Sequence, residues 1–243
     1  LKSDVPVKEK LESFLIKDVE KDKLYEFLRE MEFNRLLSQA ISFYGEPKSK
    51  KSDSLKEEKL NKIDLSKYET IVDEKKLDEW MSILKDKKII SVDTETNSLN
   101  PIDADLVGIS FCYSPNCACY IPLKHRNQKC LDKNLVLNKV KKILEDKNIR
   151  KVGQNIKFDN IIFKKNNISV EPLEDYMLAS YTLDAGLNRH NLDTLANIHL
   201  NHKTITFKDL VGTGKKKITF EDVDLKKATE YAAEDADVTF RLY

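Results

Sequence analysis

The sequence predicts an α/β fold, in which helices flank a sheet that has at least one parallel pair of strands. Strand-like and helix-like segments alternate from Tyr68 onward. The short apolar run at 89–92 fits a strand that is covered on both faces. The segment before it, 74–85, carries its large apolar side chains on one helical stripe: Leu77, Trp80, Met81 and Leu84.

The composition is that of an ordinary globular protein. A length of 243 residues gives room for one large or two small domains with an ample core. The 42 basic and 41 acidic residues leave a net charge of +1, so nucleic-acid binding would need a local basic patch. Neither a bilayer-spanning apolar run nor a signal-peptide pattern is present, which predicts no membrane partner. The first residue is Leu1, so we expect a fragment of a longer chain.

The cysteine spacing predicts free thiols in a reducing cytoplasm. The four cysteines lack paired CxxC knuckles, and nothing else indicates secretion. We therefore expect small buried thiols on strands: Cys112, Cys117, Cys119 and Cys130.

Residues 1–45 are predicted to be a small helical segment. Asp22 can cap a helix whose apolar side chains follow helical spacing: Leu24, Phe27, Leu28, Met31 and Leu36. A single amphipathic helix has little to pack against, so we expect it to dock on a neighbouring domain or another chain. Residues 46–67 are rich in Lys, Ser and Glu and are predicted to be a flexible linker.

The main domain is predicted to span 68–243. After the strand at 89–95 and a turn, two strands at 106–113 and 118–123 form a hairpin. A helix through Val140 and a short strand at 151–153 follow. The rest is expected to be helical at 156–166, 175–184, 191–201 and 224–242, with a loop at 203–222. That loop contains Gly-Thr-Gly-Lys, but its spacing does not fit a phosphate-binding loop.

Asp93 and Glu95 form the first candidate site. The two-residue period of a strand places both carboxylates on the same side. Such a pair repels unless a cation lies between them, and Mg²⁺ and Mn²⁺ prefer carboxylate oxygen. An ordinary strand end with solvated acids is the alternative.

Two further acids have a suitable context. Asp159 follows Asn155 by four residues, just after a strand end where open sheets place their sites. Asp235 follows Tyr231 by four residues on an alanine-rich helix that can approach a sheet closely. Taken singly, each has an ordinary explanation, namely a first-turn acid, a surface charge or a half-buried tyrosine.

Together these residues resemble a known group of nucleases. Asp-Thr-Glu at 93–95, Asn-x-x-x-Asp at 155–159 and Tyr-x-x-x-Asp at 231–235 are similar to the three motifs of the DEDD exonucleases, in the tyrosine branch. The histidine branch would have His where Glu230 stands. Residues 68–243 resemble the proofreading 3'-5' exonuclease domain of bacterial family A DNA polymerase I, and residues 10–45 resemble the tail of its preceding 5' nuclease domain.

The resemblance implies a ribonuclease H-like mixed sheet flanked by helices. It also implies two divalent metal ions, Mg²⁺ or Mn²⁺ with Zn²⁺ as an alternative at one site, held by Asp93, Glu95, Asp159 and Asp235. Tyr231 would orient the attacking water together with Glu95, because an unperturbed phenol is protonated at neutral pH. The implied product is a 5'-mononucleotide released from a 3' end.

The resemblance further implies contacts with a single-stranded or frayed DNA 3' end. Leu99 would wedge against the terminal bases and Phe207 would stack on one. Without the family argument, ordinary core positions are an equally good interpretation of both. Gln154, Asn155 and Arg189 could meet phosphate or sugar oxygen. The expected partner is a polymerase domain in the same full-length chain, and the expected state is a monomer.

Two alternatives remain. A ribonuclease D-like enzyme that trims RNA 3' ends would share the four acids. A non-catalytic scaffold domain of the polymerase is the other alternative, and the presence of every acid and of the tyrosine argues against it.

Overall fold

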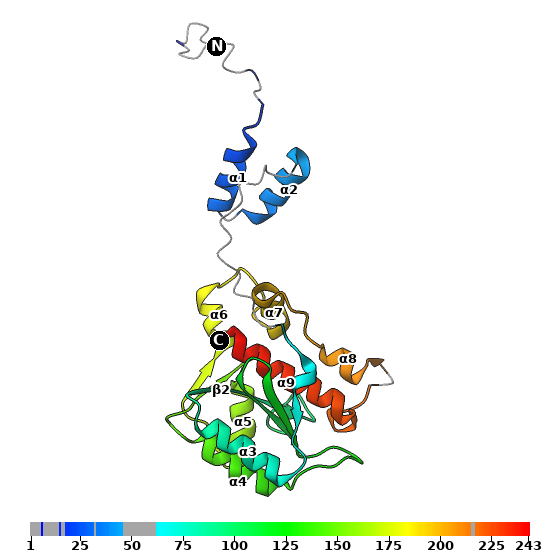
Figure 1. Ribbon diagram of the computed structural model, residues 1–243. Helices are drawn as coiled ribbons and strands as arrows, with labels where there is room; N and C mark the ends of the chain where they lie inside the picture. The colour runs from blue at the N-terminus through cyan, green and yellow to red at the C-terminus, as the bar shows by residue number, and fades with distance from the viewer. Residues whose placement is uncertain (1–5, 7–14, 16–17, 32, 46–61, 215–216) are drawn as a thin grey trace. The chain divides into compact units, whose positions relative to one another are not determined.

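The computed structural model describes residues 6, 15, 18–31, 33–45, 62–214 and 217–243 (Figure 1). The chain divides into two compact units, residues 1–58 and residues 59–243. We call them the N-terminal unit and the C-terminal unit. The predicted linker largely falls outside the described residues. Its last residues, 62–67, belong to the C-terminal unit, where the Asp64 backbone N–H donates to Asn116 Oδ1 over 2.9 Å.

Among its described residues, the N-terminal unit contains two helices where the sequence predicted one. α1 (Lys21–Glu30) and α2 (Asn34–Tyr44) pack through buried Tyr25, Leu28 and Ala40. Asp22 lies in the first turn of α1 and Glu20 is the N-cap residue, so the expected cap is wrong. The buried stripe is also rotated, because α2 covers Tyr25. Of the predicted stripe, Leu28 is buried and Leu24 is partly buried, whereas three members are exposed: Phe27, Met31 and Leu36.

The C-terminal unit is built on a six-stranded mixed sheet, which confirms the predicted fold class. The strands are β1 (Glu69–Thr70), β2 (Ile89–Thr96), β3 (Leu106–Ser114), β4 (Cys117–Pro122), β5 (Arg150–Gly153) and β6 (Leu173–Asp175). Their order is β1-β4-β3-β2-β5-β6. β2 runs antiparallel to β3 and parallel to β5. It therefore lies inside the sheet and ends next to the carboxyl end of β5.

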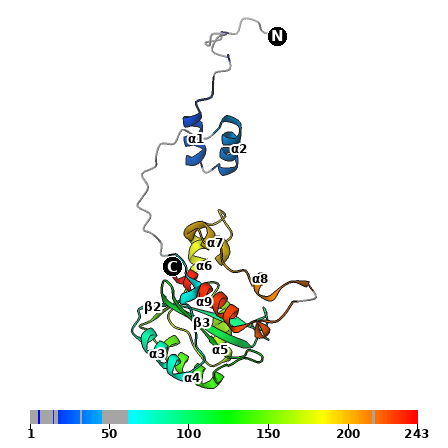
Figure 2. The same cartoon turned by 45° about the vertical axis from the view of Figure 1, so that its right-hand side comes forward.

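Helices cover both faces of the sheet (Figures 1 and 2). They are α3 (Glu74–Lys85), α4 (Lys133–Leu144), α5 (Lys157–Lys165), α6 (Tyr176–Leu183), α7 (Leu192–Leu200), α8 (Phe207–Val211) and α9 (Leu225–Leu242). α3, α4 and α5 bury the main core with one face of the sheet. α9 packs on β3, β4 and β2 on the other face. α8 and the 3₁₀ turn η4 (Phe220–Asp222) occupy the predicted loop at 203–222.

Small side chains let α9 lie close to the sheet, as the sequence predicted. Ala228, Ala232 and Ala236 are fully buried. The Ser91 hydroxyl on β2 donates to the carbonyl of Ala236 over 2.6 Å. This close approach brings the acidic side chains of α9 near those of β2. Across the described residues, no helix is long and apolar enough to cross a membrane.

Candidate active site

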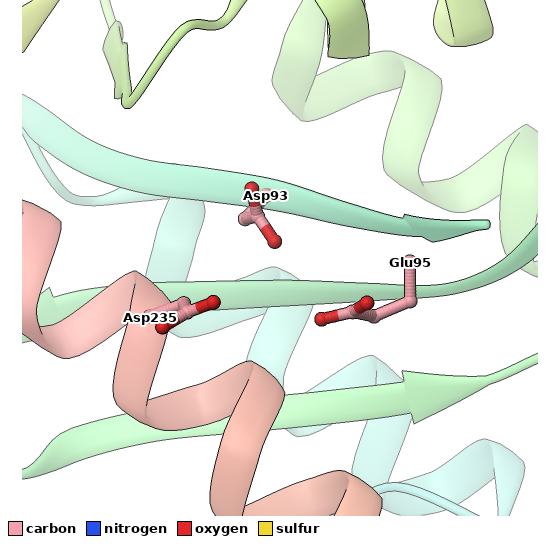
Figure 3. Close-up of side chains that lie close together, drawn as sticks. All are labelled: Asp93, Glu95 and Asp235. Carbon is pink, nitrogen blue, oxygen red and sulfur yellow. The ribbon is translucent and has the colours of Figure 1, made fainter. Parts of the chain in front are cut away.

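Three predicted carboxylates converge between β2 and α9. Oxygen atoms of Asp93, Glu95 and Asp235 all lie within 4.8 Å of one another. Figure 3 shows the three side chains turned toward a common point. β2 supplies Asp93 and Glu95 from alternate positions, and α9 supplies Asp235 from the opposite side. The strand period therefore placed the first two acids correctly.

The fourth acid, Asp159, lies beside this group. It is 3% exposed, and its Oδ1 accepts the Thr94 backbone N–H over 3.0 Å. The Thr94 hydroxyl donates to the same oxygen. Burial raises the pKa of Asp159 to about 7, although the hydrogen bonds from Thr94 act in the opposite direction. Asp159 is thus attached to the residue between the two acids of β2.

The electrostatics of the carboxylate group favour the binding of a positively charged partner. Loss of hydration raises the pKa of Asp93 well above its usual range, and the charges of Asp159, Glu95 and Asp235 raise it further. Loss of hydration is also the main cause that raises the pKa values of Glu95 and Asp235 well above their usual range. Glu95 Oε1 is buried and has no hydrogen-bond partner among the described residues. A crowded set of carboxylate oxygens with a free buried acceptor fits a hard divalent cation.

Tyr231 lies one turn before Asp235 on α9. Loss of hydration and the charge of Asp235 hold the pKa of its phenol well above the usual range. A hydrogen bond from Tyr231 lowers the pKa of Asp235. The phenol is therefore protonated at neutral pH, and it can donate and orient but cannot act as a base.

These side chains line one cleft of ≈ 640 Å³, which also holds four of the predicted substrate residues: Leu99, Gln154, Asn155 and Phe207. Leu99 is 88% exposed and Phe207 is 37% exposed, so neither is an ordinary core residue. Gln154 donates its amide to the His190 carbonyl over 2.7 Å, and its Oε1 is buried without a partner among the described residues.

Asn155 reaches the cleft from a turn. It has a positive φ of 55°, and α5 begins only at Lys157. A four-residue spacing places two side chains on one face only within a helix, and Asn155 precedes the helix that carries Asp159. The Asn155 backbone N–H donates to Asp175 Oδ1 over 3.1 Å, which ties this turn to the N-terminus of α6.

Arg189 lies elsewhere. It is exposed and lines a second hollow together with Tyr181 and His190, on the connection between α6 and α7. The Gln154–His190 hydrogen bond lies between this hollow and the cleft. A contact of Arg189 with nucleic acid remains a prediction.

Sequence reasoning missed two residues that shape the site. Thr94 stands between the two acids of the motif, and the sequence assigns it no role. Its β-branched side chain is stiff on a strand, so its hydroxyl can be held toward a hydrogen-bond acceptor on a neighbouring element. Phe220 lines the cleft from η4, inside the segment predicted to be a loop. No local pattern marks Phe220, because its neighbours in space come from distant parts of the chain.

A carboxylate cluster in an open cleft above a mixed sheet defines a candidate metal-dependent enzyme of phosphoryl transfer, such as a nuclease. A family model described as 3'-5' exonuclease matches residues 68–243, and the chain belongs to this family of enzymes. The match covers the whole sheet, α9 and every predicted site residue.

Known relatives agree with this assignment. The chain is 34% identical over 250 residues to the DNA polymerase I of Pseudomonas aeruginosa, and the matched region covers 100% of this chain and 27% of that protein. It is 38% identical over 201 residues to the DNA polymerase I of Rhizobium leguminosarum, covering 74% of this chain and 20% of that one. The chain thus spans about a quarter or less of these relatives.

Solved structures support the fold. Brucella melitensis NrnC superposes with a TM-score of 0.52 at 21% identity, covering 72% of this chain and 76% of that chain. The expected ribonuclease H-like architecture is confirmed.

Proposed function

We propose that this chain is the proofreading exonuclease of a DNA polymerase I. It removes nucleotides from the 3' end of single-stranded or frayed DNA as 5'-mononucleotides. The observation that carries the proposal is the convergence of Asp93, Glu95 and Asp235, with Asp159 beside them, in a cleft of the 3'-5' exonuclease family. The DNA polymerase I relatives support the proofreading role.

The residues present fit two divalent ions. Asp93, Glu95 and Asp235 would hold one, and Asp93 with Asp159 would hold the second. Their all-oxygen ligand set favours Mg²⁺, with Mn²⁺ as a substitute and Zn²⁺ as an alternative at one site. When bound, such a pair of ions supplies an activated water and stabilises the departing 3' oxygen.

The chain's own residues do the positioning. The protonated phenol of Tyr231 and the carboxylate of Glu95 hold the attacking water in line with the scissile phosphodiester. Thr94 keeps Asp159 turned toward the site through its two hydrogen bonds. Both contributions place groups in advance of reaction and require no proton to leave Tyr231.

The cleft accommodates the end of a single strand. Leu99 stands at its mouth against the terminal bases, and Phe207 stacks on one of them. Gln154 offers its free Oε1 to a sugar hydroxyl, and Asn155 lies nearby. Arg189 meets a phosphate further along the strand. These contacts tolerate any base sequence, as an editing enzyme requires.

The relatives also support the remaining parts of the proposal. Since they are longer bacterial DNA polymerases, we infer that a polymerase domain of the same full-length chain delivers the DNA. We place the enzyme in the cytoplasm and expect it to act as a monomer.

Degradation of a 5'-labelled single-stranded oligonucleotide tests the proposal. With Mg²⁺ we expect a ladder that shortens from the 3' end and releases 5'-mononucleotides. Asp93→Ala should reduce the rate by roughly 1,000-fold with folding intact. The matched control Glu79→Ala, at an exposed position of α3, should leave the rate unchanged. An unaltered rate in Asp93→Ala would refute the assignment of the site.

The same assay separates DNA editing from RNA trimming. An RNA oligonucleotide of equal sequence should be degraded more slowly than DNA. Faster degradation of RNA would favour a ribonuclease D-like enzyme, and degradation of neither strand would favour a scaffold domain.

A further inference from the structure

Three aromatic rings meet at one wall of the cleft. The ring centroids of Phe220 and Tyr231 lie 6.1 Å apart, and those of Phe207 and Tyr231 lie 6.2 Å apart. Phe207 and Phe220 are 6.4 Å apart and nearly parallel, with an interplanar angle of 3°. The three residues come from α8, η4 and α9, so the triangle joins three successive elements of the chain. We call it the aromatic triangle.

Phe220 is the buried corner of the aromatic triangle. It is 1% exposed, whereas Phe207 is 37% exposed and Tyr231 is half-buried. Although Phe220 lines the cleft, a group with so little exposed surface offers a substrate almost no contact area. Any effect of Phe220 on the reaction must therefore pass through the two rings that it touches.

Two further ring-bearing side chains, Tyr120 and His125, support Phe220 on the side away from the cleft. The rings of Tyr120 and His125 pack edge-on against it, at 6.3 Å and 5.8 Å. Tyr120 Oη and His125 Nε2 are hydrogen-bonded at 2.9 Å. Because both partners are buried and bonded to each other, Phe220 has a firm support on the side away from the cleft.

The backbone of η4 is anchored as well. The Arg126 backbone N–H donates to the carbonyl of Glu221 over 2.9 Å. The Glu221 carboxylate accepts from Asn97 Nδ2 over 3.2 Å, and Asn97 belongs to the loop that follows β2. The turn that carries Phe220 is therefore held by the wall of the cleft that carries Leu99.

We propose that Phe220 is a positioning residue for the exonuclease reaction. Its ring holds Tyr231 in the orientation in which the phenol directs the attacking water, and it holds Phe207 in the orientation in which that ring receives a base. This inference rests on the proposed function for the roles of Tyr231 and Phe207. It adds a residue that meets neither water nor DNA and still controls both steps.

A double-mutant cycle on single-stranded DNA tests the action through Tyr231. In the wild-type background, Phe220→Leu should lower kcat by roughly 10-fold and raise KM several-fold. In the Tyr231→Phe background, where the hydroxyl is already absent, the same change should lower kcat by less than about 2-fold. An equal loss of kcat in both backgrounds would overturn the proposal, since a general structural defect acts independently of the hydroxyl.

Phe111→Leu is the matched control. Phe111 is 0% exposed on β3 and belongs to the main core on the opposite face of the sheet. Both Phe→Leu variants should lower Tm by similar amounts, but Phe111→Leu should leave kcat and KM unchanged. If Phe111→Leu lowers kcat as much as Phe220→Leu does, reduced stability explains the effect and the proposal is wrong.

A readout that does not depend on activity separates this inference from the proposed function. In the fluorotyrosine-labelled full chain, the ¹⁹F signal of Tyr231 is identified by its loss in Tyr231→Phe. Phe220→Leu should shift or broaden that signal, and Phe111→Leu should not. An unshifted signal in Phe220→Leu would overturn the positioning role, even in a chain that degrades DNA. A shifted signal in a chain that degrades no DNA would support the positioning of the ring and refute the nuclease.

Discussion

Thr94 shows how much a single side chain contributes to the site. Successive residues of β2 point to opposite sides, so Asp93 and Glu95 face α9 while Thr94 meets Asp159 on α5. One strand segment thereby presents two acids directly and holds a third through a hydroxyl. Without the hydrogen bonds from Thr94, the Asp159 carboxylate would be free to turn away from the cleft.

Replacing Thr94 should disturb the position of the Asp159 carboxylate without preventing the chain from folding. Thr94→Val keeps the branched shape but removes the hydroxyl, so one hydrogen bond to a buried carboxylate is lost. We expect kcat to fall by roughly 10-fold and the Mg²⁺ concentration for half-maximal rate to rise. Thr94→Ser keeps the hydroxyl and should stay close to wild type. A Thr94→Val enzyme with unchanged Mg²⁺ dependence would contradict this role.

The buried acids also set how stability depends on pH. The pKa of Asp159 rises from 3.8 to about 7 on folding, so the ionised form is less favourable in the folded state. The cost begins as pH rises above 3.8 and is complete above about 7. Asp159→Asn removes that cost. In EDTA, its gain in free energy of unfolding over wild type should be roughly 2 kcal/mol larger at pH 8 than at pH 5.

Urea unfolding at the two pH values measures this difference. Saturating Mg²⁺ should reduce or reverse the advantage of Asp159→Asn at pH 8, because the wild-type carboxylate then has a positive partner. An Asp159→Asn variant whose stability relative to wild type is the same at pH 5 and pH 8 in EDTA would contradict the raised pKa of Asp159.

Single residues of this kind are unequally visible in a sequence. The four acids and Tyr231 stand at strand and helix spacings that can be recognised without a structure. Thr94 and Phe220 cannot be recognised in this way, because their importance comes from contacts with Asp159 and with the aromatic triangle. Those contacts depend on how distant elements pack.

At the scale of elements, the loop after β2 is held more firmly than its composition suggests. The Asp105 backbone N–H donates to Asn97 Oδ1 over 2.8 Å, which closes the base of the loop. Lys165 on α5 donates to the carbonyls of Ile102 and Ala104 over 2.7 Å and 2.6 Å. The loop therefore presents the exposed side chain of Leu99 from a fixed frame.

Loosening this loop should weaken DNA binding more than chemistry. Lys165→Met removes the cation that binds the loop carbonyls, so Leu99 loses its fixed position. We expect KM for single-stranded DNA to rise by roughly 5-fold with kcat little changed. Lys164→Met removes an exposed charge one residue earlier on the same helix and is the control. Equal KM values for the two variants would indicate that only net charge matters.

Helices with a clear apolar stripe could be predicted to within a residue or so. α3 coincides with the expected 74–85, and α9 begins one residue after the predicted start. β1 and β6 have two and three residues, too few to show any period. α8 has five residues and, for the same reason, its sequence does not predict a helix. The strand order depends on pairing between distant segments, which no local pattern reports.

At the scale of the whole C-terminal unit, a buried ion pair joins its beginning to its end. Asp237 on α9 is 0% exposed and binds Arg241 through Nε at 2.9 Å. It also accepts from the Tyr68 hydroxyl over 2.7 Å and from the Asn116 backbone N–H over 3.2 Å. One carboxylate thus connects the residue that precedes β1, the β3–β4 hairpin and the last helix.

Removing that charge should destabilise the fold without altering the site chemistry. Asp237→Asn removes the carboxylate charge from a buried ion pair, which should cost about 3 kcal/mol in free energy of unfolding. Asp78→Asn breaks an exposed pair with Lys139 and should cost less than about 1 kcal/mol. Urea unfolding of both variants measures the difference. Similar losses of free energy of unfolding in the two variants would mean that the buried Asp237–Arg241 pair stabilises the unit no more than an exposed pair does.

The order in which the ligands occur along the chain has a consequence for synthesis on the ribosome. Asp93 and Glu95 are made early, whereas Asp235 lies on α9, after every other element of the described fold. A nascent polypeptide that has not yet emerged as far as this helix lacks one of the three converging oxygens. Partly made copies that end before α9, and fragments that lack it, therefore do not contain the complete carboxylate cluster.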